Sequence, residues 1–265
     1  MIVKNLIKLP FFKRLIPTIF KKYIFLSKNY LKTKKIGGIK YFLDTRHLID
    51  RNFYLRENYE DDLFYIAKQL IISNKINFFL DVGSCWGIYS LRFAKIKNLK
   101  IISFDPIYKN IVRLKKMIKI NNLKSIKTYH TALGNKEGKV KLYGSDQFTP
   151  NYSIYSKNSK NVIISYINKL DNLVKIRNKI LYIKVDIEQH EYFFLVGAKK
   201  IIKNNNIILQ IEIVKKNQKK VFIFLKKNGF NLLYVDKKKG EDYIFSNFFI
   251  KKNPRNFCSE GSNFV

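Results

Sequence analysis

The sequence has few cysteines and no long apolar run, and these shortages exclude several classes of protein. Two cysteines in 265 residues, at positions 85 and 258, are too few for a disulfide framework or a four-cysteine zinc site. No run reaches the ~18 uncharged apolar residues that a membrane-spanning helix needs. No small-residue cleavage site follows a clean apolar stretch. We therefore expect a cytoplasmic protein in a reducing setting.

Acidic residues are also scarce, because 19 Asp and Glu stand against 52 Lys and Arg, a formal net charge of +33. The hydrophobic content of 46% is too high for a mostly disordered chain. The lysines are spread along the whole chain. This spread fits either compositional drift with a solvated surface or contact with an anionic partner. Arginine, which pairs bidentately with phosphate, is scarce, so a nucleic-acid partner is not favoured.

The N-terminal segment, residues 1–35, alternates apolar and basic residues. Pro10 and Pro17 would break one long helix into short pieces. Two interpretations stay open: a peripheral anchor on the anionic lipid of the inner membrane surface, or two short helices packed on the body of the protein. We divide the chain into a basic N-terminal extension (1–58), a main domain (59–250) and a polar tail (251–265).

Short apolar runs alternate with helical patterns over most of the main domain. Strands are expected at 78–82, 100–104, 125–129, 180–185 and 206–213, and helices at 59–72, 88–96, 108–121, 192–202 and 218–228. An inserted hairpin is expected at 138–143 and 161–167, and paired closing strands at 230–235 and 243–248. This order predicts an α/β fold: a doubly wound, Rossmann-like sheet, mostly parallel with an antiparallel closing strand. A strand at 39–43 belongs to a helical and β extension before it.

The turn after the first strand of this sheet contains Asp81, Gly83, Ser84 and Gly87. Glycines let the backbone bend sharply and let a ligand approach closely. The Gly-x-Gly-x-x-Gly pattern of nicotinamide-binding turns is absent. Asp81 fits poorly beside a pyrophosphate and well beside a cationic amino group.

The next two strand ends offer groups that suit an adenosine ligand. Asp105 can accept hydrogen bonds from both hydroxyls of a ribose, although it could instead be only a turn residue before Pro106. Ala132 is small enough to pack on an adenine face, or it is an ordinary strand end. Ligands of open α/β sheets bind at these carboxyl ends.

The fourth strand of the sheet ends in a cluster of ionisable side chains: Lys184, Asp186, Glu188, His190 and Glu191. A lysine and an aspartate in a short apolar strand are costly unless they are paired or used. The cluster is therefore either catalytic or a salt-bridged strand end.

These segments together resemble the FkbM-type methyltransferases, which are class I enzymes dependent on S-adenosylmethionine. The resemblance runs from about residue 38 to residue 249. It is carried by Asp81, Val82, Gly83 and Gly87, by the run from Lys184 to Glu188 with Glu191, and by Tyr59 and Glu60 upstream. Cys85 stands where the family usually has Asn, and Gln189 where it usually has Gly.

The resemblance implies O-methylation of a glycan or small molecule, as in polysaccharide biosynthesis, with S-adenosylmethionine as cofactor. It places Glu60 with Asp81, Gly83, Ser84, Gly87, Asp105 and Ala132 among the cofactor-binding residues. An alcohol acceptor must lose its proton, for which Asp186 is the first candidate, with Glu188 and His190 behind it. Asp186 and Glu212 would supply only one carboxylate each to a metal ion, which is too few ligands for a metal site, so no metal is expected.

Two other classes of function compete with this interpretation. The high positive charge is compatible with a nucleic-acid methyltransferase. However, the Asn-Pro-Pro-aromatic or Asp-Pro-Pro-aromatic element used for base methylation is absent after the fourth strand. A basic binding protein without catalytic activity is the third class, and the intact Asp81, Gly83 and Asp105 argue against it.

Overall fold

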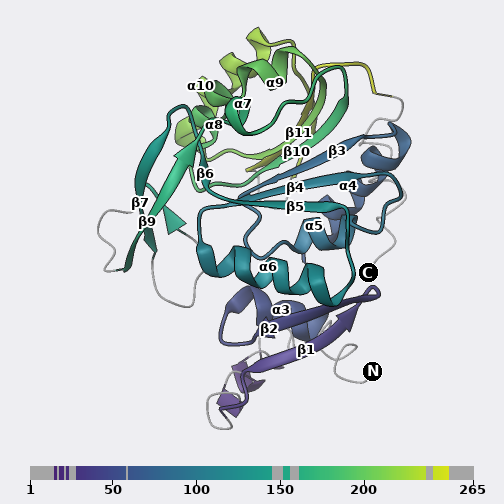
Figure 1. Cartoon of the computed structure of the whole chain (residues 1–265), viewed down its shortest axis with the longest axis vertical. Coiled ribbons are helices and arrows are strands. Elements are labelled where there is room, and N and C mark those ends of the chain that lie inside the picture. The colour runs from purple at the N-terminus through teal and green to yellow at the C-terminus, as the bar shows by residue number, and fades with distance from the viewer. Residues whose placement is uncertain are drawn as a thin grey trace.

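A seven-stranded mixed sheet forms the centre of the molecule in the computed structural model (Figure 1). The structure describes residues 15–16, 18–20, 22–23, 28–57, 59–144, 152–155, 161–236 and 241–250. The strands of the main sheet are β3 (Phe78–Val82), β4 (Lys100–Asp105), β5 (Ile126–His130), β10 (Ile180–Val185), β11 (Asn206–Glu212), β12 (Asn231–Val235) and β13 (Asp242–Ser246).

The strand order is β12-β13-β11-β10-β3-β4-β5, with β10 in the middle and β3 beside it. The five strands from β11 to β5 pair in parallel, and β13 runs antiparallel to both β11 and β12. The predicted fold class, a doubly wound and mostly parallel Rossmann-like sheet with an antiparallel closing strand, is confirmed. The strand order reverses between β3 and β10, which is where ligands of open α/β sheets bind.

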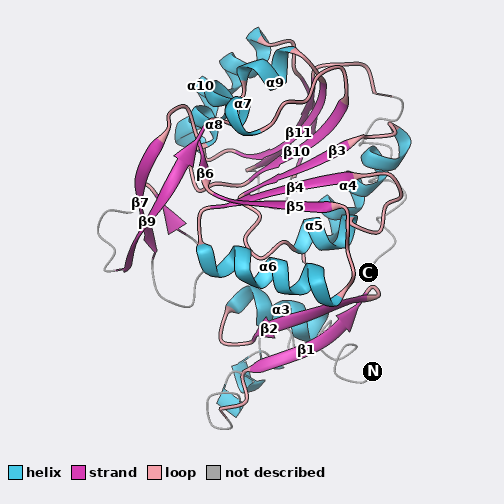
Figure 2. Ribbon diagram, in the orientation of Figure 1, coloured by secondary structure: helices cyan, strands magenta, loops and turns pink. Residues whose placement is uncertain are grey.

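Helices cover both faces of this sheet (Figure 2). On one side lie α4 (Asp61–Ser73), α5 (Ile88–Phe93) and α6 (Tyr108–Ile120), and on the other α7 (Leu170–Leu173), α8 (Glu191–Gly197), α9 (Lys199–Lys203) and α10 (Lys215–Lys227). Successive residues of β3 face opposite sides, as a strand requires: Phe79 packs with α4 and α5, whereas Leu80 packs with α8 and α9. Both faces are therefore apolar cores, and polar groups are left to the strand ends.

Several helices differ from their predicted limits: α5 ends at Phe93 rather than at residue 96, and α10 begins at Lys215 rather than at residue 218. Two further differences have a local reason. Helix α4 begins at Asp61 rather than at residue 59, because Glu60 takes a left-handed conformation with φ 49° at its N-cap. The helix predicted at 192–202 is two helices, α8 and α9, separated at Ala198. A Cβ on Gly197 would lie 1.8 Å from the carbonyl oxygen of Gly134, so this end of α8 packs directly on another backbone.

The predicted inserted hairpin is part of a four-stranded sheet of order β6-β9-β7-β8. Its strands are β6 (Ala132–Leu133), β7 (Gly138–Gly144), β8 (Tyr152–Ser153) and β9 (Asn161–Asn168). The hairpin of β7 and β9 was predicted, whereas the two-residue strands β6 and β8 were not, because they are too short to show a periodicity. Leu142, Val140 and Ile167 form a small core on one face of this sheet.

The N-terminal extension adds a hairpin and a helix: β1 (Leu31–Ile36), β2 (Ile39–Asp44) and α3 (Leu48–Arg56). Tyr41 of β2 and Phe53 of α3 are fully buried and pack edge-on against each other. Both also contact Trp86, which follows β3. The extension is thus joined to the main domain through an aromatic cluster.

Much of the segment expected to be an anchor or a pair of helices, including residues 1–14, lies outside the described residues. The polar tail 251–265 and most of the loop between β7 and β9 also lie outside them. No described helix has the length and apolar character to cross a membrane.

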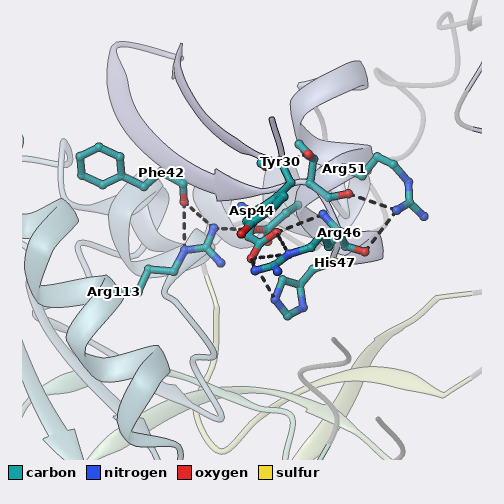
Figure 3. Close-up of polar contacts among 9 residues, drawn as sticks. Tyr30, Phe42, Asp44, Arg46, His47, Arg51 and Arg113 are labelled. Atoms are coloured by element: carbon teal, nitrogen blue, oxygen red, sulfur yellow. Dashed lines mark hydrogen bonds and ion pairs between the residues drawn. The ribbon is translucent and has the colours of Figure 1, made fainter. Parts of the chain in front are cut away.

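A buried ion pair also fastens the extension to α6. Asp50 of α3 is 1% exposed and lies 2.6 Å from the Arg113 guanidinium, and it accepts a second hydrogen bond from the backbone N–H of Asp44. Figure 3 shows the Arg113 side chain reaching the carbonyl oxygen of Phe42 in β2 (Nε to O, 2.9 Å). Burial raises the pKa of Asp50, and the Arg113 charge opposes this rise.

We expect Arg113→Met to lower the free energy of unfolding by about 3 kcal/mol, because it leaves a buried carboxylate without its cation. Urea denaturation measures this change. Arg177→Met removes an exposed arginine as a control and should shift stability by less than about 0.5 kcal/mol. Equal effects of the two substitutions would contradict a structural role for the Asp50–Arg113 pair.

Candidate active site

A cavity of about 280 Å³ opens at the carboxyl ends of the central strands. Eight of the nine predicted site residues line it: Glu60, Asp81, Gly83, Ser84, Asp105, Ala132, Asp186 and Glu188. They come from the loop before α4, from the ends of β3, β4 and β10, and from β6, which follows β5. The topology therefore brings together residues that lie up to 128 positions apart in the sequence.

Gly83 sets the floor of this cavity by a backbone contact. Its φ is +78°, and a Cβ at this position would lie 1.8 Å from the carbonyl oxygen of Asp186. The backbone N–H of Asp186 in turn donates to the carbonyl of Val82 (3.0 Å). The turn after β3 and the turn after β10 are thus pressed together, and only glycine fits between them.

Gly87 is the predicted site residue that is absent from the cavity lining. It is the N-cap of α5 with φ +85°, and a Cβ there would lie 2.5 Å from Cδ1 of Leu114 in α6. The left-handed conformation and the close packing of α5 against α6 therefore explain why this residue is a glycine. The expected direct contact with a ligand stays a prediction.

Asp81 is buried at the end of β3 and is held by a chain of hydroxyls. The Ser90 hydroxyl donates to its Oδ2 (2.6 Å) and lies 2.7 Å from the Ser103 hydroxyl. Burial raises the pKa of Asp81, while the nearby Lys184 charge and the Ser90 hydrogen bond oppose that rise. Burying a charged carboxylate costs free energy, and a cationic ligand bound beside Asp81 would offset that cost.

Asp105 accepts three hydrogen bonds, two from the residues that follow it and one from the turn after β3. The donors are the backbone N–H groups of Cys85 (2.8 Å) and Ile107 (2.9 Å) and the side-chain amide of Asn110 (3.0 Å). Asp105 thus fixes its turn and also lines the cavity, so the two interpretations of this residue are compatible. Burial raises its pKa to about 7, although the three hydrogen bonds oppose the shift.

Lys184 is buried and forms an ion pair with Asp186. Its Nζ lies 3.0 Å from Oδ2 of Asp186 and 5.1 Å from the centre of the Tyr89 ring. Burial alone would lower its pKa, but the charges of Asp186, Glu60 and other neighbours raise it well above the usual value. Glu60 is held nearby, because the Tyr89 hydroxyl donates to its Oε2 (3.2 Å).

Asp186 is more open than its partner, since its side chain is 33% exposed whereas that of Lys184 is 8% exposed. Glu212, at the end of β11, shares a hydrogen bond with Asp186, and burial together with the Asp186 charge raises the pKa of Glu212 to about 8. Glu188 has φ 52°, and its pKa is raised by burial and by Asp186. In the described part of the chain, no group of three or more His, Cys, Asp or Glu is placed to hold a metal ion.

The cavity gathers acids from a chain that is mostly basic. Six carboxyl groups and one lysine line it, as far as the structure describes the chain; the acids are Glu60, Asp81, Asp105, Asp186, Glu188 and Glu212. These six are nearly a third of the 19 acidic residues in the sequence. Each would be destabilised by the others in a low-dielectric site, so the cavity favours a ligand with positive charge.

The opposite wall of the cavity comes from the inserted sheet, which no sequence motif had marked. Leu142, Tyr152 and Ile154 line this wall. The sequence predicted the hairpin of β7 and β9, but nothing in it indicated that the hairpin met the carboxyl ends of the main sheet. Ile49 of α3 also lines the cavity, so the N-terminal extension contributes to it as well.

His190 lies on the same wall in a structural position. It is 9% exposed, stacks on Phe193, and its Nδ1 is 2.9 Å from the Tyr155 hydroxyl. Burial lowers its pKa to about 4, so the ring is neutral at pH 7. The role of His190 as a base behind Asp186 and Glu188 stays a prediction.

The Methyltransferase FkbM domain model matches residues 81–232, more than half of the chain. Similar solved structures include TYW2 from M. jannaschii in complex with AdoMet (11% identity, TM-score 0.46, covering 82% of this chain and 84% of that one). A precorrin-6y C5,15-methyltransferase from Geobacter metallireducens is similar at 8% identity and TM-score 0.42, covering 71% of this chain and 89% of that one. A comparison with curated proteins gives no match.

Both departures from the family pattern fall at left-handed positions. Cys85 has φ 51° and Gln189 has φ 80°. Asn and Gly, the residues expected there, are the ones that adopt this conformation at least cost. The Gln189 side-chain oxygen is also buried without a hydrogen-bond partner among the described residues, while its backbone carbonyl accepts from Asn217 (3.0 Å).

We expect Gln189→Gly to raise the free energy of unfolding by about 1 kcal/mol. Relief of the left-handed strain outweighs the greater entropy that glycine gives to the unfolded chain. The midpoint of urea unfolding, with an unchanged slope, measures this. Gln189→Ala keeps the Cβ and serves as control, with a smaller gain expected. A loss of stability on Gln189→Gly would show that the glutamine side chain holds the turn.

Proposed function

The chain belongs to the FkbM family of S-adenosylmethionine-dependent methyltransferases, and on that premise we propose that its acceptor is a hydroxyl group of a glycan or small molecule. The observation that supports this acceptor is the acidic lining of the cavity. Carboxylates accept hydrogen bonds from neutral hydroxyls, whereas they repel phosphate and carboxylate groups. The acceptor class is our proposal, because membership of the family establishes only that the chain is an S-adenosylmethionine-dependent methyltransferase.

The acidic residues of the cavity suit the positive charge of the cofactor. We assign Asp81 and Glu60 to its amino group, Asp105 to the ribose hydroxyls and Ala132 to the adenine face. Gly83 and Ser84 form the turn that it approaches, next to the carbonyl of Asp186. When bound, S-adenosylmethionine supplies a methyl group that is already activated on a positively charged sulfur.

Asp186 is the proposed catalytic residue, because its carboxylate is exposed to the cavity and held in place on one side. Lys184 binds Oδ2 at 3.0 Å, which fixes the carboxylate and favours its charged form. The hydrogen bond with Glu212 adds a second support. Asp186 can then accept the hydrogen of an acceptor hydroxyl and orient the oxygen for in-line transfer. Glu188, beside it, is the second candidate for this proton.

A nucleic-acid acceptor is the alternative, favoured by the net charge of +33. Phosphates would have to enter a cavity lined by six carboxyl groups and one lysine. This repulsion is the reason why we prefer a neutral acceptor. A catalytically silent binding protein is disfavoured by the retained Asp81, Gly83 and Asp105.

Transfer of a labelled methyl group from S-adenosylmethionine to candidate acceptors tests the proposed function. The panel contains neutral oligosaccharides, small alcohols, RNA and duplex DNA. We expect label in a product that survives mild alkali, as a methyl ether does and a methyl ester does not. Label in RNA or DNA alone would overturn the proposal.

Replacement of Asp105 tests the assignment to the ribose. Asp105→Ala should weaken S-adenosylhomocysteine binding by ~1.5–3 kcal/mol, the range for a hydrogen bond to a charged group. The raised pKa of Asp105, about 7, adds a pH dependence: the wild-type affinity should fall as the pH drops below 7, because the carboxylate takes up a proton. Calorimetry at several pH values measures both effects.

The control for this measurement is Asp62→Ala, which removes an exposed acid of α4 outside the cavity lining. Its affinity and pH dependence should match the wild type. If Asp105→Ala binds as the wild type does, Asp105 is only a turn residue.

Asp186→Asn should lower turnover by ~10²–10⁴-fold while cofactor affinity changes little, because the amide keeps the shape but cannot accept a proton. The measurement is release of S-adenosylhomocysteine with an acceptor found in the panel above. Glu188→Gln is the matched comparison and should cost less. Unfolding of Asp186→Asn, or a larger loss in Glu188→Gln, would contradict the assignment.

A further inference from the structure

The inserted sheet has an outer face whose composition is unusual for an exposed surface. Three residues of β9 point outward and remain exposed: Val162 (47%), Ile164 (66%) and Tyr166 (60%). The alternate residues of the strand, Ser165 and Ile167, are buried. An antiparallel sheet with one covered face normally carries polar residues on the other. Here the solvent side of β9 is apolar.

The neighbouring strand β7 completes this face with lysines. The register pairs Ile164 with Lys141 and Tyr166 with Lys139, while Val162 pairs with Tyr143. Directly paired residues of an antiparallel sheet lie on the same face, and both lysines are exposed. We call these six residues the β7–β9 face. It carries two aliphatic side chains, two tyrosines and two lysines, and no acidic residue.

This combination matches the boundary layer of an anionic membrane. Aliphatic side chains gain free energy by entering the acyl boundary, tyrosine rings lie at the headgroup level, and lysines attract anionic lipid. Figure 1 shows β7 and β9 at the margin of the molecule, away from α4 and α5. We propose that the β7–β9 face docks the protein on the surface of an anionic lipid bilayer.

Two other occupants suit this face less well. A nucleic acid backbone would offer no apolar contact to Val162 and Ile164. Its phosphates are also better matched by arginine than by lysine. A second copy of the chain would bring two lysine-bearing faces together between molecules of net charge +33 each. The lipid surface alone uses both the apolar and the cationic residues.

Docking through this face has a consequence for the cavity. Leu142, between Lys141 and Tyr143 on β7, points to the opposite side of the same strand and lines the cavity. The cavity wall and the lipid-facing surface are thus two sides of one sheet. In the docked protein this sheet would therefore lie between the bilayer surface and the cavity.

Flotation of the full-length protein with lipid vesicles tests the proposal. The vesicles are phosphatidylcholine alone or phosphatidylcholine mixed with phosphatidylglycerol. We expect the wild type to float with the mixed vesicles at low salt and to be released as salt screens the lysines. Lys139→Gln/Lys141→Gln should lower the partition roughly 25-fold, about five-fold per lysine. Ile164→Ser/Tyr166→Ser should lower it at least about tenfold.

Matched controls on α10 separate this face from the general charge of the chain. Lys219→Gln/Lys226→Gln makes the same change in charge at exposed positions, and Ile223→Ser removes an exposed isoleucine (47%). Both should partition nearly as the wild type does. Circular dichroism verifies that every variant is folded, and Val162→Ser provides a milder apolar variant.

Three results would overturn the proposal. The first is an equal loss of partition in the β7–β9 and α10 lysine variants, which would indicate non-specific attraction. The second is unchanged vesicle binding in the apolar variants together with lost binding of a DNA duplex in Lys139→Gln/Lys141→Gln, which would indicate a nucleic-acid surface. The third is a wild-type dimer in light scattering that Ile164→Ser/Tyr166→Ser dissociates, which would assign the face to a second copy.

Discussion

The contact between Gly83 and the carbonyl of Asp186 is the constraint on which the rest of the site depends. It holds the turn after β3 against the turn after β10, at the place where the strand order reverses. Any side chain at position 83 would separate these turns. Because the two turns meet here, the acids that precede and follow them, Asp81 and Asp186, line one cavity with a single lysine between them.

The charge of the cavity lining is opposite in sign to the net charge of the chain. A chain with 52 basic and 19 acidic residues lines its cavity with six acids and one lysine. Burial makes each of these carboxylates costly, and the raised pKa values of Asp105 and Glu212 express that cost. Lys184 offsets part of it through Asp186, Glu60 and Asp81. The remainder is what a positively charged ligand would neutralise.

The N-terminal extension and the inserted sheet close this cavity from two sides. Trp86 packs against Tyr41 and Phe53, and the Asp50–Arg113 pair joins α3 to α6. This places Ile49 in the cavity lining. The inserted sheet supplies the other wall through Leu142 and Tyr152. The cavity is therefore shaped by elements added to the central sheet, while the sheet itself carries the charged groups.

The sequence by itself determined the parallel strands, the helices between them and the residues at the strand ends. Short apolar runs ending in Gly83, Asp105 and Asp186 are local patterns, and a strand followed by a helix places its end at the carboxyl edge whatever the distant parts of the chain do. The sequence also determined the family, because each of the two motifs, around Gly83 and around Asp186, is a short continuous segment.

Only the tertiary structure decided how the charged groups are paired and what closes the cavity. The ion pair between Lys184 and Asp186, the hydrogen bond of Glu212 and the packing of Gly87 on Leu114 depend on distances across strands and helices that no local pattern encodes. The strands β6 and β8 are two residues long, so they exist only because β7 and β9 are already in place to pair with them. The left-handed turn at Gln189 likewise follows from the fold, since a glutamine alone predicts no such conformation.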